Sequence, residues 1–254
     1  MAPRRRVRTG LVPKRPPLAR RLATAARWPV GVGLTSWSYM WRTTPMHRRE
    51  EVGSSADDAP PELPVGVSRD ELQHASDGAG PLVHRRYAML VREPQTTPEE
   101  LIARVASDLN PVTPTSFAVF HKVAGDDDGM RVGDEYVVRM AAPWDGPVRV
   151  IDRTPRSFRF ATLDGHLEAG QIEFRAAPAP EGLRFEIESW ARSGDRLSNL
   201  LYNHLRMAKE VQLHMWTSFL ERVVKASGGR RTGGLDIETR VVAQDALPED
   251  TVSA

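Results

Sequence analysis

Residues 196–227, which contain no proline or glycine, constrain the fold of this chain most strongly. Its apolar side chains recur at steps of three and four residues, which gathers them on one face of an α-helix. They are Leu197, Leu200, Leu201, Leu205, Ala208, Val211, Met215, Phe219 and Val223. Ser193 or Asp195 is a typical helix cap, and Gly228-Gly229 a typical helix end. A helix of about 30 residues is ~45 Å long, so its apolar face needs a whole sheet as partner.

That sheet is predicted in the preceding part of the chain. Residues 83–92 alternate like a strand, Thr97-Pro98-Glu99-Glu100 begins a helix, and residues 115–123 resemble another strand. Five further strand-like runs follow without a helix between them: residues 131–141, 147–153, 157–163, 171–177 and 183–192. The connections are short, which favours antiparallel pairing. The pattern predicts an α+β fold in which a curved antiparallel sheet packs on a long C-terminal helix.

The ends of the chain differ in composition from this central part. Residues 1–49 are predicted to be a basic, largely disordered arm with a short amphipathic aromatic segment, and residues 50–81 a linker rich in proline, glycine and serine. Residues 82–227 form the predicted domain, and residues 228–254 a flexible tail. The absence of cysteine excludes disulfides and thiolate sites, and it fits a reducing, cytoplasmic location.

The charge is unevenly distributed. Residues 1–49 contain twelve arginines and lysines and no acid, whereas the rest of the chain carries 23 basic and 33 acidic residues. A basic arm with tryptophans favours peripheral contact with an anionic membrane. The arm carries no base-reading geometry, so we expect no sequence-specific nucleic-acid partner. Nucleotide-binding glycine motifs and standard metal-ligand spacings are absent, so no cofactor and no metal are expected.

One short segment points to a known family. Residues 158–170 read Phe-Arg-Phe-Ala-Thr-Leu-Asp-Gly-His-Leu-Glu-Ala-Gly, with Phe174 downstream. This strand–turn–strand segment, with its Gly-His-x-Glu-x-Gly element, resembles the signature of the DUF-nineteen-ninety (DUF1990) family of the START-like (SRPBCC, helix-grip) superfamily. The resemblance covers about residues 82–227, and the family brings no assigned activity. The superfamily implies a cavity between sheet and helix that binds sterols, lipids, polyketides or hormones, and sometimes cyclises or hydrolyses them.

His166, Glu168 and His204 are the candidate catalytic residues. A histidine titrates near neutral pH and a nearby carboxylate can orient it, which suits acid–base chemistry at a cavity mouth. The alternative is structural: a hairpin in which Gly165 and Gly170 allow positive φ and His166 bonds to the neighbouring loop, while His204 is a core histidine. The structural interpretation is favoured for both histidines.

The candidate ligand-binding residues combine apolar surface with a few polar groups, as small-molecule sites do. They are His121, Arg139, Met140, Trp144, Trp190, His204, Met207 and Met215. The sequence leaves open which sheet face lines the cavity, because alternation does not say where the helix lies. The first hypothesis is a module that binds an apolar molecule of lipid, isoprenoid or polyketide type. A cavity enzyme of cyclase or hydrolase type and a scaffold without ligand are the alternatives.

Overall fold

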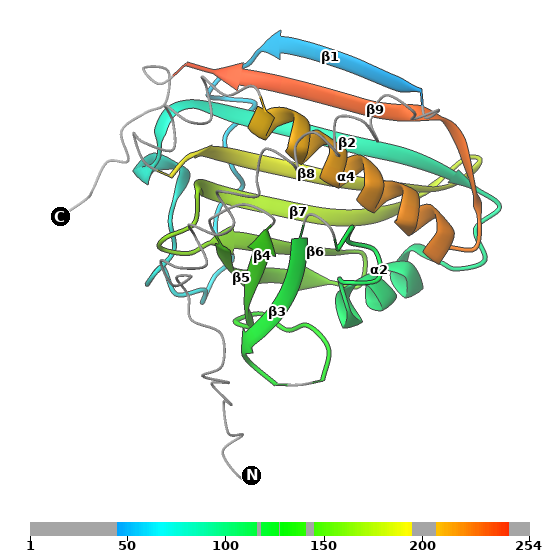
Figure 1. Ribbon diagram of the computed structural model, residues 1–254, viewed down its shortest axis with the longest axis horizontal. Helices are drawn as coiled ribbons and strands as arrows, with labels where there is room; N and C mark the ends of the chain where they lie inside the picture. Colours follow the sequence, from blue (N-terminus) through cyan, green and yellow to red (C-terminus); the bar gives the residue numbers. More distant parts are fainter. Residues whose placement is uncertain (1–44, 116–117, 127, 141–144, 195–206, 244–254) are drawn as a thin grey trace.

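The computed structural model describes residues 45–115, 118–126, 128–140, 145–194 and 207–243, without the side chains of residues 207–211. Within these residues, nine strands form a single sheet in the order β1-β9-β2-β8-β7-β6-β5-β4-β3 (Figure 1). The strands are β1 (Met46–Val52), β2 (Ala79–Arg92), β3 (Ala118–Ala124), β4 (Glu135–Met140), β5 (Asp145–Thr154), β6 (Ser157–Thr162), β7 (Glu168–Ala179), β8 (Gly182–Ser193) and β9 (Arg230–Val242). All neighbours are antiparallel except β1 and β9, which are parallel.

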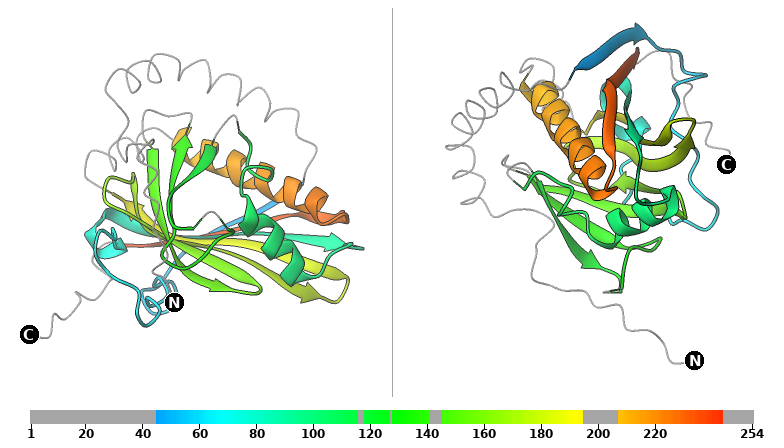
Figure 2. Two further views of the ribbon diagram at one scale, coloured as in Figure 1. Left: turned by 90° about the horizontal axis from the view of Figure 1, so that it is seen from below. Right: turned by 90° about the vertical axis from the view of Figure 1, so that its right-hand side faces the viewer.

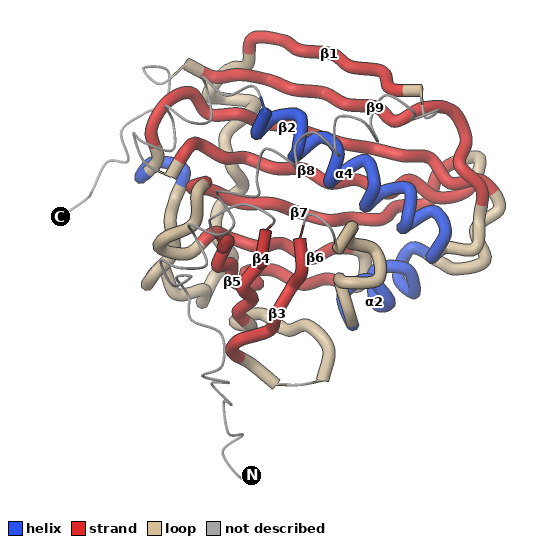
Figure 3. Tube along the Cα trace, in the orientation of Figure 1, coloured by secondary structure: helices blue, strands red, loops and turns tan. Residues whose placement is uncertain are grey.

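Two helices pack on the same face of this sheet. They are α2 (Pro98–Ser107) and α4 (Met207–Ala226), and a single turn of 3-10 helix, η1 (Ala75–Asp77), precedes β2. The sheet curves around α4, which crosses it diagonally (Figures 2 and 3). No helix in the described part of the chain is long and apolar enough to span a bilayer. The predicted α+β helix-grip fold is confirmed, because a curved antiparallel sheet grips a C-terminal helix.

Strand alternation divides the sheet into two faces. We call the side covered by α4 the helix face; it carries Tyr87, Phe174 and Ile187, which lie opposite one another in β2, β7 and β8. The other side is the outer face, which carries residues of the opposite parity, such as His84 and Trp190. Unlike the helix face, the outer face is covered by chain segments rather than by a long helix.

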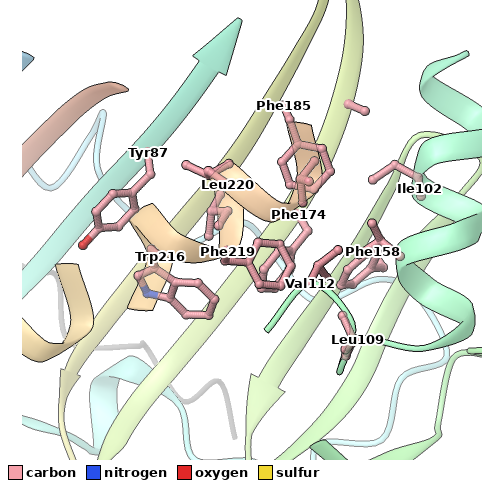
Figure 4. Packing of buried hydrophobic residues seen from close by; sticks show 14 of the residues in the cluster. Tyr87, Ile102, Leu109, Val112, Phe158, Phe174, Phe185, Trp216, Phe219 and Leu220 are labelled. Atoms are coloured by element: carbon pink, nitrogen blue, oxygen red, sulfur yellow. The ribbon is translucent and has the colours of Figure 1, made fainter. Parts of the chain in front are cut away.

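The core on the helix face is rich in aromatic side chains (Figure 4). Phe174 stacks on Phe158 with ring centroids 4.8 Å apart, and it meets Trp216 and Phe219 of α4 at 5.6 and 5.4 Å. Phe158, Phe174, Phe185 and Phe219 have no more than 1% of their surface exposed. The long apolar stripe recognised in the sequence therefore packs as predicted within the described part of α4; residues 195–206, which the prediction included, lie outside the described residues.

The structure corrects the expectation of a flexible tail, because residues 230–242 form β9. This strand pairs with β2 on one side and with β1 on the other. Leu235 and Val242 are fully buried, and Ile237 is 6% exposed. The segment looked loose because its apolar residues are few and stand among glycines and arginines. Its stability comes from a pairing partner almost 150 residues earlier in the chain, which local composition does not reveal.

The segment predicted as a linker is likewise ordered on the outer face. It begins with the end of β1, and the Arg159 side chain of the outer face donates to the Glu62 carbonyl at 3.3 Å. The Gln171 side chain donates to the Pro61 carbonyl at 3.0 Å, and Leu72 packs with Leu163 and Ile151. Prolines have no backbone N–H and disfavour the interior of a helix, but their carbonyls can accept from the side-chain donors that a sheet supplies.

The start of α2 gives a first testable prediction. The Thr97 hydroxyl accepts from the Glu100 amide at 3.2 Å, and the Glu100 carboxylate accepts from the Thr97 amide at 2.9 Å. This reciprocal capping box satisfies two amides at the helix start. Thr97→Ala is expected to lower the free energy of unfolding by about 1 kcal/mol, measured by urea denaturation. Thr115→Ala, an exposed threonine outside α2, is the control; an equal loss there would refute the capping argument.

Candidate ligand site

Side-chain size falls along the helix face from one end to the other. Beyond the row that contains Phe174 and Ile187, the next row across β7, β8 and β2 is Ile172, Ser189 and Arg85. The row after that places Gly170 beside Ala191. Large aromatic rings therefore fill one end of the space under α4, whereas small side chains occupy the centre of the sheet at the end where the described part of α4 begins.

The apolar side chains also become less buried in the same direction along the helix face. Several apolar residues at this second end are only half-buried, although they pack against the main core. They are Phe120, Val138, Ile172 and Met215. They come from β3, β4, β7 and α4, so they surround the small residues from several sides. Half-buried apolar side chains around small ones form the wall that an apolar ligand needs.

A polar network stands beside this apolar wall. Gln212 on α4 accepts through Oε1 from the Arg85 guanidinium at 2.8 Å and donates through Nε2 to the Glu168 carboxylate at 3.3 Å. Arg85, only 8% exposed, also donates to the Tyr87 hydroxyl at 3.4 Å and to Thr239 at 3.3 Å. The network fixes the orientation of the Gln212 amide, and it joins α4 to β2 and β7. Such a group can orient the polar end of a mostly apolar molecule.

Tyr87 borders both parts of the site. Its ring belongs to the aromatic core, and its hydroxyl points away from the phenylalanine rings (Figure 4). Burial raises the pKa of Tyr87, which the nearby charge of Arg85 only partly counteracts. The hydroxyl therefore stays protonated at neutral pH and serves as a hydrogen-bonding group.

Sequence reasoning missed Arg85, Tyr87 and Gln212. Arg85 has the same parity in β2 as Tyr87, Met89 and Val91, so a charged residue stands on the apolar side of its strand. That mismatch was a usable signal. Gln212 gave no such signal, since a glutamine on a helix is usually solvated.

His166 lies in the turn between β6 and β7 and contacts backbone. Its Nδ1 lies 2.9 Å from the Glu168 amide nitrogen and 3.0 Å from the Glu168 carbonyl oxygen. Burial lowers the pKa of His166, more than the nearby Glu168 charge raises it. The neutral ring accepts the Glu168 amide hydrogen bond, and its Nε2 side packs over Gly146. These are the contacts of the hairpin interpretation, while the Glu168 carboxylate is hydrogen-bonded to Gln212.

The remaining candidate ligand residues lie on different faces of the sheet. Met140 and Met215 are half-buried on the helix side. His121 and Arg139, opposite Val137 and Asp145, lie on the outer face, as does Trp190, so these three do not line a space beneath α4. The sequence alone did not fix which parity faces the helix. Trp144, His204 and the side chain of Met207 lie outside the described residues.

The outer face carries a second polar cluster centred on His84. Its Nδ1 lies 2.6 Å from the Asp58 carboxylate and its Nε2 lies 2.8 Å from the Glu188 carboxylate. Its ring stacks on Trp190 with centroids 5.1 Å apart. Burial alone would lower the pKa of His84, but the hydrogen bonds with Glu188 and Asp58 outweigh burial, so the pKa is raised. Residues 53–78, between β1 and β2, run over the outer face, and we call them the crossing segment. Through its contact with Asp58, His84 joins this segment to the sheet.

A network of ion pairs continues from His84 across the outer face. Arg175 lies 2.6 Å from both Glu186 and Glu188, and Arg240 lies 2.9 Å from Glu238. His84, Arg86, Glu238 and Arg240 line a hollow of about 90 Å³. Opposite charges alternate in this network and the hollow is small, so we assign it to anchoring the crossing segment rather than to holding a ligand. Among the described residues, no three histidines or carboxylates group closely enough to hold a metal.

The His84 cluster predicts a pH dependence of stability. Because folding raises the pKa of His84, its contribution is complete below the pKa of the unfolded chain and is lost as pH rises through the folded value. Hydrogen bonding with His84 outweighs burial and lowers the pKa of Asp58 and Glu188, so their contribution is lost as pH falls. The unfolding free energy is expected to decline from mildly acidic to alkaline pH.

Urea unfolding across a pH series checks this expectation. His84→Gln removes the titrating group, so the decline on the alkaline side should become shallower. His47→Gln, the same substitution at an exposed position of β1, is the matched control. An identical pH profile for His84→Gln and the wild type would contradict the assignment.

No curated protein sequence matches the chain. Similar solved structures include the di-domain ARO/CYC StfQ from the steffimycin biosynthetic pathway, at 9% identity over 61% of this chain and 52% of StfQ, with a TM-score of 0.45. Norcoclaurine synthase from Thalictrum flavum matches at 10% identity over 66% of this chain and 96% of its own, with a TM-score of 0.40. Ara h 8.0201 matches at 12% over 56% and 99%, with a TM-score of 0.38.

The match to a protein family covers more of the chain than the matches to these three structures do. The sequence profile of a domain of unknown function, DUF1990, matches residues 48–222. The matched range includes most of β1, the crossing segment, strands β2 to β8 and most of α4, so it extends well before the domain start predicted at residue 82. More than half of the chain is covered, and the chain therefore belongs to the DUF1990 family.

Proposed function

We propose that this protein binds an apolar small molecule between the helix face of the sheet and the beginning of the described part of α4. The observation that carries the proposal is the change along the helix face from fully buried aromatic rings to small and half-buried side chains. Binding without catalysis is the simplest function for this arrangement. The ligand is of lipid, isoprenoid or polyketide type, since these are mostly apolar with few polar groups.

The polar network supports a definite orientation of the ligand. Gln212 is hydrogen-bonded to both Arg85 and Glu168 before any ligand arrives, so little side-chain entropy is lost when a polar group meets them. The apolar part of the molecule would then lie against Ile172, Val138 and Phe120. Its binding free energy would come mainly from burial of apolar surface, at about 25 cal/mol per Å².

Filling the proposed space tests the site. Ser189→Trp places a large ring in the centre of the helix face, opposite Arg85 and Ile172. The probe is 1-anilinonaphthalene-8-sulfonate, which fluoresces in apolar sites. The wild type should bind it saturably, and Ser189→Trp should bind at least about tenfold more weakly, a loss of about 1.4 kcal/mol. The matched control is Ala177→Trp, an exposed position on the outer face of β7.

Two outcomes would overturn the proposal. Absence of saturable binding by the wild type would favour a scaffold whose space is filled by its own side chains. Equal binding of the probe by the wild type and by Ser189→Trp would mean that the probe binds outside the proposed site. Circular dichroism of both variants checks that they fold. Native mass spectrometry of protein purified gently from its host, followed by extraction, would identify the class of a bound molecule.

The basic arm motivates a second part of the proposal. Residues 1–49 contain twelve arginines and lysines and no acid, and each basic residue near an anionic leaflet contributes about 1 kcal/mol. We propose that the arm holds the protein at anionic membranes. Liposomes containing phosphatidylserine should carry the full-length chain upward in flotation at low salt, and high salt should release it. Recovery of the chain only in the soluble fraction at low salt would refute this part.

A further inference from the structure

The edge strand β1 has a charge order that is complementary to itself. It is the outermost strand of the described sheet beyond β9, at the top of Figure 1. Its sequence is Met-His-Arg-Arg-Glu-Glu-Val, so the basic residues occupy the first half and the acidic residues the second. Charged edge strands usually prevent pairing with other chains. Here, however, an antiparallel copy of the same strand would place bases opposite acids.

The hydrogen bonds to β9 show which residues of β1 face outward. The Leu235 amide donates to the Pro45 carbonyl, and the Gly53 amide donates to the Val241 carbonyl, both at 2.9 Å. Residues that bond to a neighbouring parallel strand alternate with residues whose amide and carbonyl point the other way. The odd-numbered residues of β1 therefore bond to β9. The amides and carbonyls of the even-numbered residues, Met46, Arg48, Glu50 and Val52, point to the outer side.

In one antiparallel register, all of these outward-pointing amides and carbonyls can pair with those of a second copy of β1. Opposite residues in a sheet share a face, so a twofold axis perpendicular to the sheet must pass midway between one residue of β1 and its own copy. If that residue is Arg49, the middle one, the strand overlaps its copy over its whole length. Arg48 then faces Glu50 of the second copy, and Met46 faces Val52 of the second copy. Both pairs consist of outward-pointing residues, as the hydrogen-bonded pairs of an antiparallel ladder require.

Burial of side chains favours the same pairing. Val52 is 93% exposed, which is unusual for a large apolar residue in a strand. In this register it lies against Met46 of the second copy, and Met46 already packs on the main core. The like charges of Arg49 on the axis are balanced by Glu51, which pairs with Arg49 in the same chain at 3.7 Å and is its diagonal neighbour across the interface.

We propose that two copies of this chain associate through β1, antiparallel and with Arg49 on the twofold axis, to form one continuous sheet. The surface is independent of the proposed ligand site, because it lies at the sheet edge beyond β9. The association depends on the order of charges in β1, so a change of sign at one position should weaken it and a second change should restore it.

Cysteine crosslinking tests the register directly, because the natural chain contains no cysteine. In the proposed dimer the two residues at position 49 form a pair without mutual hydrogen bonds, with Cα atoms about 4.5 Å apart, within disulfide range. Arg49→Cys should therefore crosslink to a covalent dimer under mild oxidation. His47→Cys should stay monomeric on a non-reducing gel, since its two copies would lie about 13 Å apart. Equal crosslinking of both variants, or of neither, would overturn the proposal.

A charge-swap series provides the second test, in the full-length chain by analytical ultracentrifugation. Arg48→Glu and Glu50→Arg each create two like-charge pairs and should raise the dimer dissociation constant about tenfold or more. The double variant should restore the wild-type value. Arg69→Glu, an exposed change of the same sign outside the sheet, is the control for net charge. A wild type that remains monomeric at every concentration, or a dimer unaffected by the single swaps, would refute the association.

Discussion

Replacing Gly170 by alanine is expected to destabilise this protein by more than about 3 kcal/mol. Gly170 has φ +154°, and a Cβ atom there would lie 1.9 Å from the Trp190 carbonyl oxygen and 2.9 Å from the Ala191 Cα. Both obstacles are backbone atoms of β8, which is held by ladders to β2 and β7 and cannot move aside. The Gly170 amide also donates to the Thr162 hydroxyl at 2.9 Å, which fixes its position.

The control separates steric overlap from backbone strain. Gly129 also has a positive φ, +66°, but a Cβ atom there would meet nothing within 4 Å. Gly129→Ala should therefore cost only about 1 kcal/mol of backbone strain. Urea unfolding of both variants gives the comparison, and a Gly170→Ala protein as stable as Gly129→Ala would contradict the described packing. The result matters for the family signature as well, because Gly170 closes its Gly-His-x-Glu-x-Gly element.

Truncation of Phe174 should have the next largest effect. This side chain is 1% exposed and lies between the sheet and α4, in ring contact with Phe158, Phe160, Trp216 and Phe219. Phe174→Ala leaves a cavity that these rigid rings cannot close, so the free energy of unfolding should fall by about 3–5 kcal/mol. Urea denaturation measures the loss directly.

Phe120 is the matched control for Phe174. It lies on the same face of the sheet but is only half-buried, at the end assigned to the ligand. Phe120→Ala should cost clearly less stability than Phe174→Ala, and it should change binding of the fluorescent probe. Equal losses of stability at the two positions would mean that both ends of the helix face are packed alike, and the proposed ligand space would lose its main support.

Local sequence patterns determined the elements of this fold well. The stripe that includes Phe219 and Val223 predicted α4, the Thr97-Pro98 start predicted α2, and every predicted strand corresponds to one in the sheet. These features depend on neighbours a few residues apart, which the sequence displays directly. The family signature around His166 also depended on a single hairpin, and the family it indicated is the one to which the chain belongs.

Pairings between distant segments were decided only by the tertiary structure. The strand β9 lacks a strong pattern of its own and is stabilised between β1 and β2. His84 is enclosed by Asp58 and Glu188, which lie 26 and 104 residues away in the chain. Nothing near any of the three in sequence indicates that they meet, because the contact follows from how the crossing segment lies over the sheet.

The composition of the candidate site also required the tertiary structure. Alternation indicated that His121 shares a face with Val119 and Arg139 with Val137, but not which face α4 covers. The helix lies on the other side, and the site is instead built from Arg85, Gln212 and the small residues of β8. The sequence determined the two faces of each strand, whereas the face that α4 covers was decided by the direction in which the sheet curves and by the position of the helix.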